Sequence, residues 1–219
     1  MAEPAAFIFD LDGVITDTAE YHFLAWKRLA DEEGVPFTRE DNDQLRGVSR
    51  RQSLLFLLKG RVLPEDQMET WMNRKNEYYR ESLKQVTPKD LLPGVAEFLK
   101  EAKARGIKLG LASASKNAQD VMQNLGVIGE MDAIGDGYSV SNSKPAPDLF
   151  VWVAGRLGVA PAQCVVFEDA EAGIEAALAG GMYAVGLGPA SRLGKAHLVL
   201  PNLQGVSVDQ ILRALPPTP

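Results

Sequence analysis

The sequence of 219 residues contains a single cysteine, Cys164. One thiol cannot form an internal disulfide framework or a cysteine-based zinc cluster, so both are excluded. Cys164 opens an apolar run, and we expect it to be a small buried hydrophobic residue.

Long hydrophobic runs and basic runs are also missing. No apolar stretch approaches the roughly 18 to 20 residues of a membrane span, and the first residues lack the basic and apolar segments of a secretory signal. The net charge is −6, whereas nucleic-acid-binding proteins usually carry a basic patch. We therefore expect a soluble, cytoplasmic, monomeric protein with no membrane or nucleic-acid partner.

One stretch organises the chain, residues 7–14 with the sequence FIFDLDGV. The apolar run over residues 5–9 is typical of a buried parallel strand, and Asp10 and Asp12 follow where it should end. In an extended chain the two carboxylates share one face, and Gly13 then permits a sharp turn. Because paired carboxylates repel, this arrangement favours a bound cation or a raised pKa on one of them. The alternative is a pair of solvated loop acids.

Residues 18–86 contain helix signals and no strand signal. Asp17 with Glu20 is a candidate N-cap for a helix ending near Glu33. Thr38 with Asp41, and Ser49 with Gln52, resemble two further helix starts, the second for a helix ending near Gly60. A long helix is expected over residues 65–85, after Pro64.

Strand and helix signals alternate after residue 88. Strands are expected at residues 107–112, 131–134, 164–167, 182–187 and 197–200, with helices between them. This alternation predicts an α/β fold with a parallel sheet and helices on both faces. The helical block interrupts it, so we expect a discontinuous core domain of residues 1–17 and 88–219 and an inserted helical domain of residues 18–87.

Three further expected strand ends carry polar groups. Glu168 and Asp169 end one strand, and with the first acid pair they suit a hard cation such as Mg²⁺. Ser113, Ser115 and Asn117 offer donors where a helix begins, which forms an anion site. Lys144 adds a compact positive charge. Together they indicate Mg²⁺-assisted phosphoryl transfer, although taken singly each could be a turn acid, a helix cap or a surface lysine.

The ordered set DLDGV at residues 10–14, Ser113, Lys144-Pro145 and Glu168-Asp169 resembles the four-motif pattern of the haloacid-dehalogenase-like superfamily. The resemblance covers residues 7 to about 200. It implies a Rossmann-like parallel sheet core with an inserted, movable, all-helical cap domain. It also implies that Asp10 is a nucleophile forming an aspartyl phosphate and that Asp12 is the general acid/base.

The same resemblance implies roles for the remaining motifs. Ser113 and Lys144 would hold the transferring phosphate. The implied Mg²⁺ ligands are Asp10, the backbone carbonyl of Asp12, Glu168 and Asp169. The dehalogenase branch needs no acid/base, so Asp12 favours phosphate chemistry over carbon–halogen cleavage.

A narrower resemblance is to the β-phosphoglucomutase family. It is carried by residues 16–23 with Trp26, residues 45–50 with Ser53, residues 74–76, and residues 113–117. The implied reaction interconverts β-D-glucose 1-phosphate and β-D-glucose 6-phosphate through an enzyme-bound glucose 1,6-bisphosphate, so the expected partner is a small sugar phosphate. The expected substrate-binding residues are His22, Trp26, Arg46, Gly47, Val48, Ser49, Arg50, Ser53, Lys75, Asn76, Ser113, Ala114, Ser115, Lys116, Asn117 and Lys144.

A bisphosphate requires a second anion site. Arg46 and Arg50 flank a glycine turn at an expected helix N-terminus, where free N–H groups and bidentate arginines bind phosphate. His22 and Trp26 lie one helical turn apart and could meet the sugar, although ordinary packing would also explain them. Arg46 stands where this family is expected to have lysine, residues 135–142 match poorly, and Ala170 replaces a common serine.

Two other functions remain open. A phosphatase on the same scaffold would use the same four motifs with water as the acceptor. A non-catalytic phospho-acceptor signalling module also uses a strand-end aspartate with Mg²⁺. A helical insertion of about 70 residues with its own anion site argues against the second.

Overall fold

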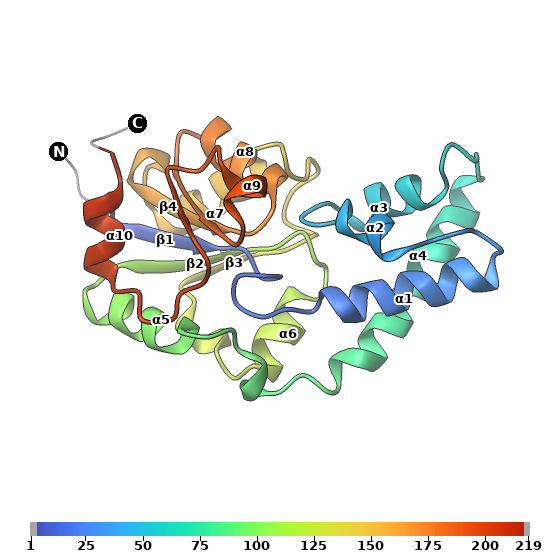
Figure 1. Cartoon of the computed structure of the whole chain (residues 1–219), viewed down its shortest axis with the longest axis horizontal. Coiled ribbons are helices and arrows are strands. Elements are labelled where there is room, and N and C mark those ends of the chain that lie inside the picture. Colours follow the sequence, from blue (N-terminus) through green and yellow to red (C-terminus); the bar gives the residue numbers. More distant parts are fainter. Residues whose placement is uncertain (1–3, 217–219) are drawn as a thin grey trace.

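The computed structural model describes residues 4–216, in which six parallel strands form one sheet (Figure 1). The strands are β1 (Ala6–Phe9), β2 (Lys108–Ala112), β3 (Ala133–Gly135), β4 (Cys164–Glu168), β5 (Tyr183–Leu187) and β6 (Leu198–Leu200). Their spatial order is β3-β2-β1-β4-β5-β6, so β1 lies between β2 and β4. The predicted parallel α/β fold is confirmed.

Helices cover both faces of the sheet. One face packs against α5 (Val95–Ala104), α6 (Ala118–Asn124) and α10 (Val208–Ala214), and the other against α7 (Asp148–Leu157), α8 (Glu171–Ala179) and α9 (Ala190–Leu193). Alternate residues of β1 enter the two cores, because side chains of a strand alternate between faces. Phe7 and Phe9 pack with Phe98 of α5, and Ile8 lies in the opposite core.

The described chain between β1 and β2 contains the expected helical block. Its helices are α1 (Ala19–Glu32), α2 (Arg39–Asp43), α3 (Arg50–Leu57) and α4 (Glu65–Leu83), and they gather at the right of Figure 1. They enclose a hydrophobic core of their own, centred on Trp26, Leu54 and Trp71. The C-terminal half of α4 instead joins the core of the sheet through Tyr79 and Leu83.

Helix capping follows the sequence closely, with one exception. The capping boxes of Thr38 with Asp41 and of Ser49 with Gln52 are both present. The expectation that Asp17 is the N-cap of α1 is wrong. Asp17 Oδ1 accepts a hydrogen bond from Ala19 N at 2.9 Å, and the helix begins one residue later with Thr18 at the cap position.

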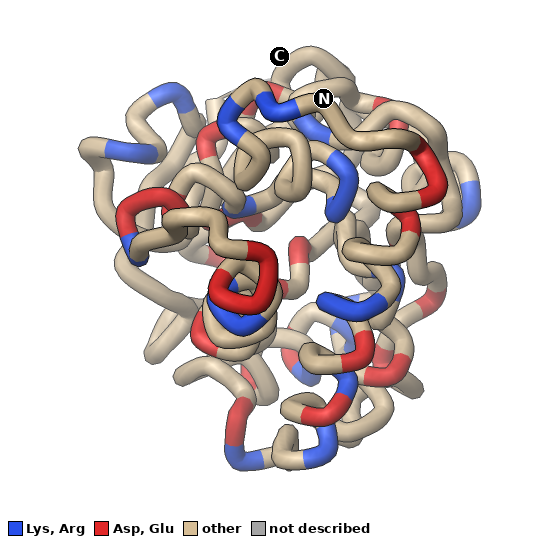
Figure 2. The backbone as a smooth tube through the Cα atoms, turned by 90° about the vertical axis from the view of Figure 1, so that its right-hand side faces the viewer, with Lys and Arg blue, Asp and Glu red and all other residues tan. Residues whose placement is uncertain are grey.

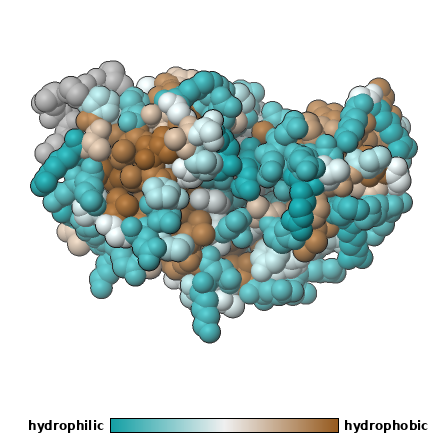
Figure 3. Space-filling model, in the orientation of Figure 1, coloured by the Kyte–Doolittle hydropathy of each residue, from teal (hydrophilic) through white to brown (hydrophobic). Residues whose placement is uncertain are grey.

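The remaining secondary structure consists of the one-turn 3-10 helices η1 (Pro88–Asp90), η2 (Ile128–Glu130) and η3 (Pro161–Gln163). Cys164 is buried, as expected. Within residues 4–216 no helix has the length and apolar character needed to cross a bilayer. Lysine and arginine are interspersed with aspartate and glutamate at the end of the molecule formed by the helical block (Figure 2). In the view of Figure 3, the largest group of hydrophobic surface residues lies at the left, on the part of the molecule that contains the sheet.

Candidate active site

The sheet order brings three expected motifs together at one edge. Because β1 pairs with β2 on one side and β4 on the other, Asp10 is flanked by Ser113 and by Glu168 with Asp169. The backbone N–H of Asp10 donates to Phe167 O at 2.9 Å, which extends the β1–β4 register to the site. This is the point where the strand order reverses, and open α/β sheets bind their ligands beyond the carboxyl ends of strands at that point.

Lys144 lies beneath the cavity and joins the acids of two strands. Its Nζ lies 2.6 Å from Asp10 Oδ1, 2.7 Å from Glu168 Oε2 and 3.2 Å from the carbonyl oxygen of Ala112. Burial alone would lower the pKa of Lys144, but the carboxylates of Asp10 and Glu168 outweigh it and raise the pKa above its ordinary value. The ammonium therefore stays charged.

Asp10, Glu168 and Asp169 form a cluster in which one oxygen of each lies within 4.8 Å of the others. Burial and the charge of Asp10 raise the pKa of both Glu168 and Asp169. Three crowded carboxylates are a donor set suited to a hard divalent cation, which would relieve their repulsion. The residues present therefore fit Mg²⁺.

Two glycines make room for these acids. A Cβ on Gly13 would lie 2.4 Å from Asp169 Oδ2, and the φ of +81° at Gly13 is disfavoured for other residues. A Cβ on Gly173 of α8 would lie 2.0 Å from Glu168 Oε2. Any side chain at either position would displace a carboxylate of the cluster.

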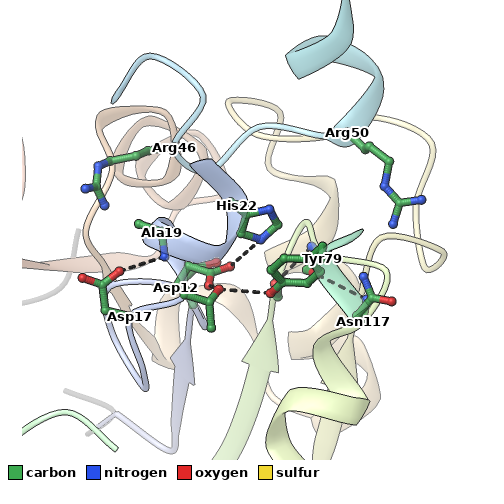
Figure 4. A network of polar contacts seen from close by, with 12 residues as sticks. Asp12, Asp17, Ala19, His22, Arg46, Arg50, Tyr79 and Asn117 are labelled. Atoms are coloured by element: carbon green, nitrogen blue, oxygen red, sulfur yellow. Dashed lines mark hydrogen bonds and ion pairs between the residues drawn. The ribbon is translucent and has the colours of Figure 1, made fainter. Parts of the chain in front are cut away.

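Asp12 belongs to a separate network that reaches into the helical block. It accepts a hydrogen bond from Thr18 Oγ1, and Thr18 Oγ1 lies 3.0 Å from Tyr79 OH. His22 Nε2 lies 3.9 Å from Asp12 Oδ2 (Figure 4). Burial and then the charge of Asp10 raise the pKa of Asp12 to about 7. A carboxyl with this pKa can both give and take a proton near neutral pH.

His22 is oriented by Lys75. Lys75 Nζ lies 2.7 Å from His22 Nδ1, and with Lys75 as the donor Nδ1 accepts, which leaves the ring proton on Nε2. Burial, followed by the charge of Arg50, lowers the pKa of Lys75 well below its ordinary value. Burial, followed by the charge of Lys75, lowers the pKa of His22 well below its ordinary value, so the ring is neutral. His22 stacks on Tyr79 at 4.0 Å, and Lys75 lies over the rings of Trp26 and Tyr79.

Arg50 is linked to the core through Asn76 of α4. Its Nη2 donates to Asn76 Oδ1 at 2.8 Å, and the same oxygen accepts from Asn117 Nδ2 at 2.8 Å. Burial lowers the pKa of Arg50. In residues 4–216 neither Arg50 nor Lys75 forms an ion pair with a carboxylate. Both basic side chains line the cavity.

Arg46 does not join Arg50. The two arginines flank the glycine turn and line the same cavity, but Arg46 points away from Arg50 (Figure 4). Arg46 Nη1 donates to Asp169 Oδ2 at 3.2 Å, beside the acid cluster. The glycine turn between them, with φ of +72° at Gly47, sends the two side chains in different directions.

A cavity enclosing about 810 Å³, partly open to solvent, lies between the sheet edge and the helical block. Its lining includes most of the expected site residues: Asp10, Asp12, His22, Trp26, Arg46, Gly47, Val48, Arg50, Ser53, Lys75, Asn76, Ser113, Ala114, Ser115, Lys116, Asn117 and Asp169. Lys144 and Glu168 lie beneath it. Ser49 is outside it, and its hydroxyl caps α3.

Some contributors were not expected as site residues, although Ala19 and Leu45 belong to the stretches that carry the narrower resemblance. Ala19, Asn42 and Leu45 line the cavity. Tyr79 contacts Thr18 and His22, and Arg192 Nε donates to the carbonyl oxygen of Asp169 at 2.9 Å. Tyr79 lies on the buried face of a long helix, where the sequence predicts only packing. Arg192 lies outside any motif, where the sequence predicts only a surface position.

Residues 4–181 match the model of the haloacid dehalogenase-like hydrolase family. The chain belongs to this family. Among haloacid dehalogenase-like relatives, it is 43% identical over 209 residues to a β-phosphoglucomutase from Bacillus subtilis (strain 168), covering 93% of this chain and 92% of the relative. It is 32% identical over 213 residues to a phosphorylated carbohydrates phosphatase from Thermotoga maritima, covering 96% and 97%.

The fold agrees with this membership. The crystal structure of a β-phosphoglucomutase from Clostridium difficile is similar, with a TM-score of 0.93, 39% identity, and coverage of 96% of each chain. The predicted haloacid-dehalogenase-like resemblance is therefore confirmed.

Proposed function

We propose that this chain is a β-phosphoglucomutase that interconverts β-D-glucose 1-phosphate and β-D-glucose 6-phosphate. The observation that carries the proposal is one cavity with anion-binding groups on two sides. Lys144 and Ser113 lie with Asp10 at the sheet edge. Arg50 and Lys75, two basic side chains without a carboxylate ion pair in residues 4–216, lie on the helical block. A hexose bisphosphate has a phosphate for each side of the cavity.

The helical block is proposed to act as a cap. We assign residues 18–87 to the cap domain and residues 1–17 and 88–219 to the core domain. Polar contacts between the two include Asn117 Nδ2 to Asn76 Oδ1 at 2.8 Å and Ser143 Oγ to Gln52 Oε1 at 2.7 Å. Such side-chain contacts can break and re-form as a cap opens and closes. Closure of the cap excludes water from the reaction.

Asp10 is the proposed nucleophile. Its carboxylate attacks the phosphorus of the bisphosphate, the bond to the sugar oxygen breaks, and an aspartyl phosphate forms. Lys144 engages one oxygen of Asp10, and with Ser113 it is placed to hold the phosphate oxygens. When the 1-phosphate is attacked, glucose 6-phosphate leaves. The aspartyl phosphate then transfers its phosphoryl group to the 6-hydroxyl of an incoming β-glucose 1-phosphate, which regenerates the bisphosphate and free Asp10.

Asp12 is the proposed general acid/base. It protonates the sugar oxygen that leaves and takes the proton from the hydroxyl that attacks. The hydrogen bond from Thr18 Oγ1 orients its carboxyl group, and His22 Nε2 lies 3.9 Å from Asp12 Oδ2. With a pKa of about 7, Asp12 is populated in both protonation states at neutral pH.

Asp10, Glu168, Asp169 and the carbonyl oxygen of Asp12 are the proposed Mg²⁺ ligands. A bound Mg²⁺ would supply positive charge that offsets the repulsion between a carboxylate nucleophile and a phosphate. The remaining proposed substrate-binding residues are those that line the cavity. Ser49 contributes to binding through the capping of α3, whose first residue is Arg50.

The test is incubation of the protein with β-glucose 1-phosphate, Mg²⁺ and a trace of β-glucose 1,6-bisphosphate, with glucose 6-phosphate and inorganic phosphate measured in parallel. A mutase produces glucose 6-phosphate in large excess over inorganic phosphate. Release of phosphate without glucose 6-phosphate would overturn the proposal. The α-anomer of glucose 1-phosphate serves as a stereochemical control.

A sugar-phosphate phosphatase is the second candidate, because a relative 32% identical to the chain is named a phosphorylated carbohydrates phosphatase. It would use the same nucleophile, with water in place of the second sugar hydroxyl. The same incubation separates the two activities.

A further inference from the structure

Arg46 connects the helical block to the acid cluster of the core. It lies between α2 and α3, and its Nη1 donates to Asp169 Oδ2 at 3.2 Å. Its side chain is 27% exposed and that of Asp169 is 7% exposed, so the contact is largely shielded from water. It joins positions 123 residues apart in the sequence.

Asp169 does not need Arg46 to hold it in place. Arg192 belongs to α9, which follows β5. Its Nε donates to the carbonyl oxygen of Asp169 at 2.9 Å, and its Nη2 lies 3.7 Å from Asp169 Oδ2. These contacts lie within the core and are independent of the helical block. The contact of Arg46 is therefore the one that depends on the position of the helical block.

The contact also separates two cavities. Arg46 and Asp169 are the two residues that line both the active-site cavity and a neighbouring hollow, whose lining includes Gly13, Arg192 and Leu203. Arg46 Nε is buried without a hydrogen-bond partner in the described part of the chain. The same Nε lies 3.7 Å from Asp43 Oδ1, so the guanidinium of Arg46 lies between a carboxylate of the helical block and one of the core.

A guanidinium and a divalent cation both draw on the charge of the same carboxylate, and each repels the other. We propose that Arg46 competes with Mg²⁺ for Asp169: its contact holds the cap over the metal-free site, and metal binding releases it. The identity of the metal rests on the proposed function, whereas the competition rests on the observed contact. In a mutase the cap must reopen so that the bisphosphate can change its orientation between the two transfer steps. Because the metal weakens the contact of Arg46, that contact would not oppose the reopening.

The test is the dissociation constant of Mg²⁺ measured by calorimetry without any sugar phosphate. In Arg46→Met the constant is expected to fall roughly three- to tenfold, because a charge-assisted hydrogen bond no longer has to be displaced. In an Asp169→Asn background, which lacks the charged partner of the contact, the same substitution is expected to lower the constant less, because only the repulsion between the guanidinium and the cation remains. Arg39→Met is the matched control, since Arg39 is a cap arginine paired with Glu20 outside the site.

Small-angle scattering provides a second measurement. Mg²⁺ is expected to increase the radius of gyration of the wild-type protein, because it releases the cap contact. Arg46→Met lacks this contact, so its radius of gyration is expected to be the larger one even without metal. An unchanged or weaker Mg²⁺ affinity in Arg46→Met, or an equal shift in the Asp169→Asn background, would overturn the competition. Arg46→Gln replaces Arg46→Met if the latter does not fold. Neither measurement uses a sugar phosphate, so both still test the competition if the mutase assay fails.

Discussion

The ammonium of Lys144 lies 2.6 Å from Asp10 Oδ1, and Lys144 is fully buried. The contact joins the loop before α7 to the end of β1, so the proposed nucleophile is oriented without a ligand. Glu168 accepts from the same ammonium at 2.7 Å. One buried cation thus compensates two buried carboxylates.

Lys144→Met is expected to destabilise the metal-free protein by about 3–5 kcal/mol, because removing one partner leaves buried carboxylates uncompensated. Urea unfolding in EDTA measures this loss, and Mg²⁺ is expected to restore part of it. Lys108→Met is the control, because Lys108 Nζ donates to a backbone carbonyl, that of Leu157. Equal stability of the two variants would contradict the structural role of Lys144.

Asp10→Asn is expected to abolish phosphoenzyme formation and turnover, since an amide is neither a nucleophile nor a negatively charged metal ligand. Labelling with a radioactive phosphoryl donor followed by denaturing electrophoresis detects the phosphoenzyme. Asp17→Asn makes the same chemical change at the start of α1, outside the active-site cavity, and is expected to be labelled like the wild type. Labelled Asp10→Asn protein would refute the assignment.

Asp12→Asn is expected to reduce turnover by about 10²–10⁴, the usual contribution of a general acid/base. It also has a signature in stability. The pKa of Asp12 is raised from 3.8 to about 7, so between these pH values the folded state binds the extra proton and stability falls as pH rises. Without metal, Asp12→Asn should therefore raise the melting temperature more at pH 8 than at pH 4. An identical shift at both pH values would count against the raised pKa.

Arg50→Ala is expected to separate mutase from phosphatase. It should severely reduce use of the bisphosphate, whose distal phosphate loses a cationic partner, and barely affect phosphorylation by acetyl phosphate, which has no distal phosphate. Arg51→Ala is the control, because Arg51 pairs with Glu65 on the outer side of α3. Equal losses with both donors would remove the argument for a distal phosphate site at Arg50.

Several features were predictable because local chemistry decides them. The apolar run before Asp10 forms the predicted strand, and the capping boxes at Thr38 and Ser49 start the predicted helices. The bounds of short strands were predicted less exactly. The third strand is Ala133–Gly135 and not residues 131–134, because its ends are set by pairing with β2, where Gly110 faces Ala133.

The sequence by itself determined the residue types of the site and their order. Asp10, Ser113, Lys144 and Asp169 each follow or precede an element whose pattern is local. Only the tertiary structure decided their neighbours, because strand order is fixed by packing between distant segments. It placed Arg46 on Asp169 and Arg50 on Asn76, although the two arginines are four residues apart. The direction of a side chain beyond a glycine turn depends on backbone geometry and on the charges it meets, and sequence spacing encodes neither.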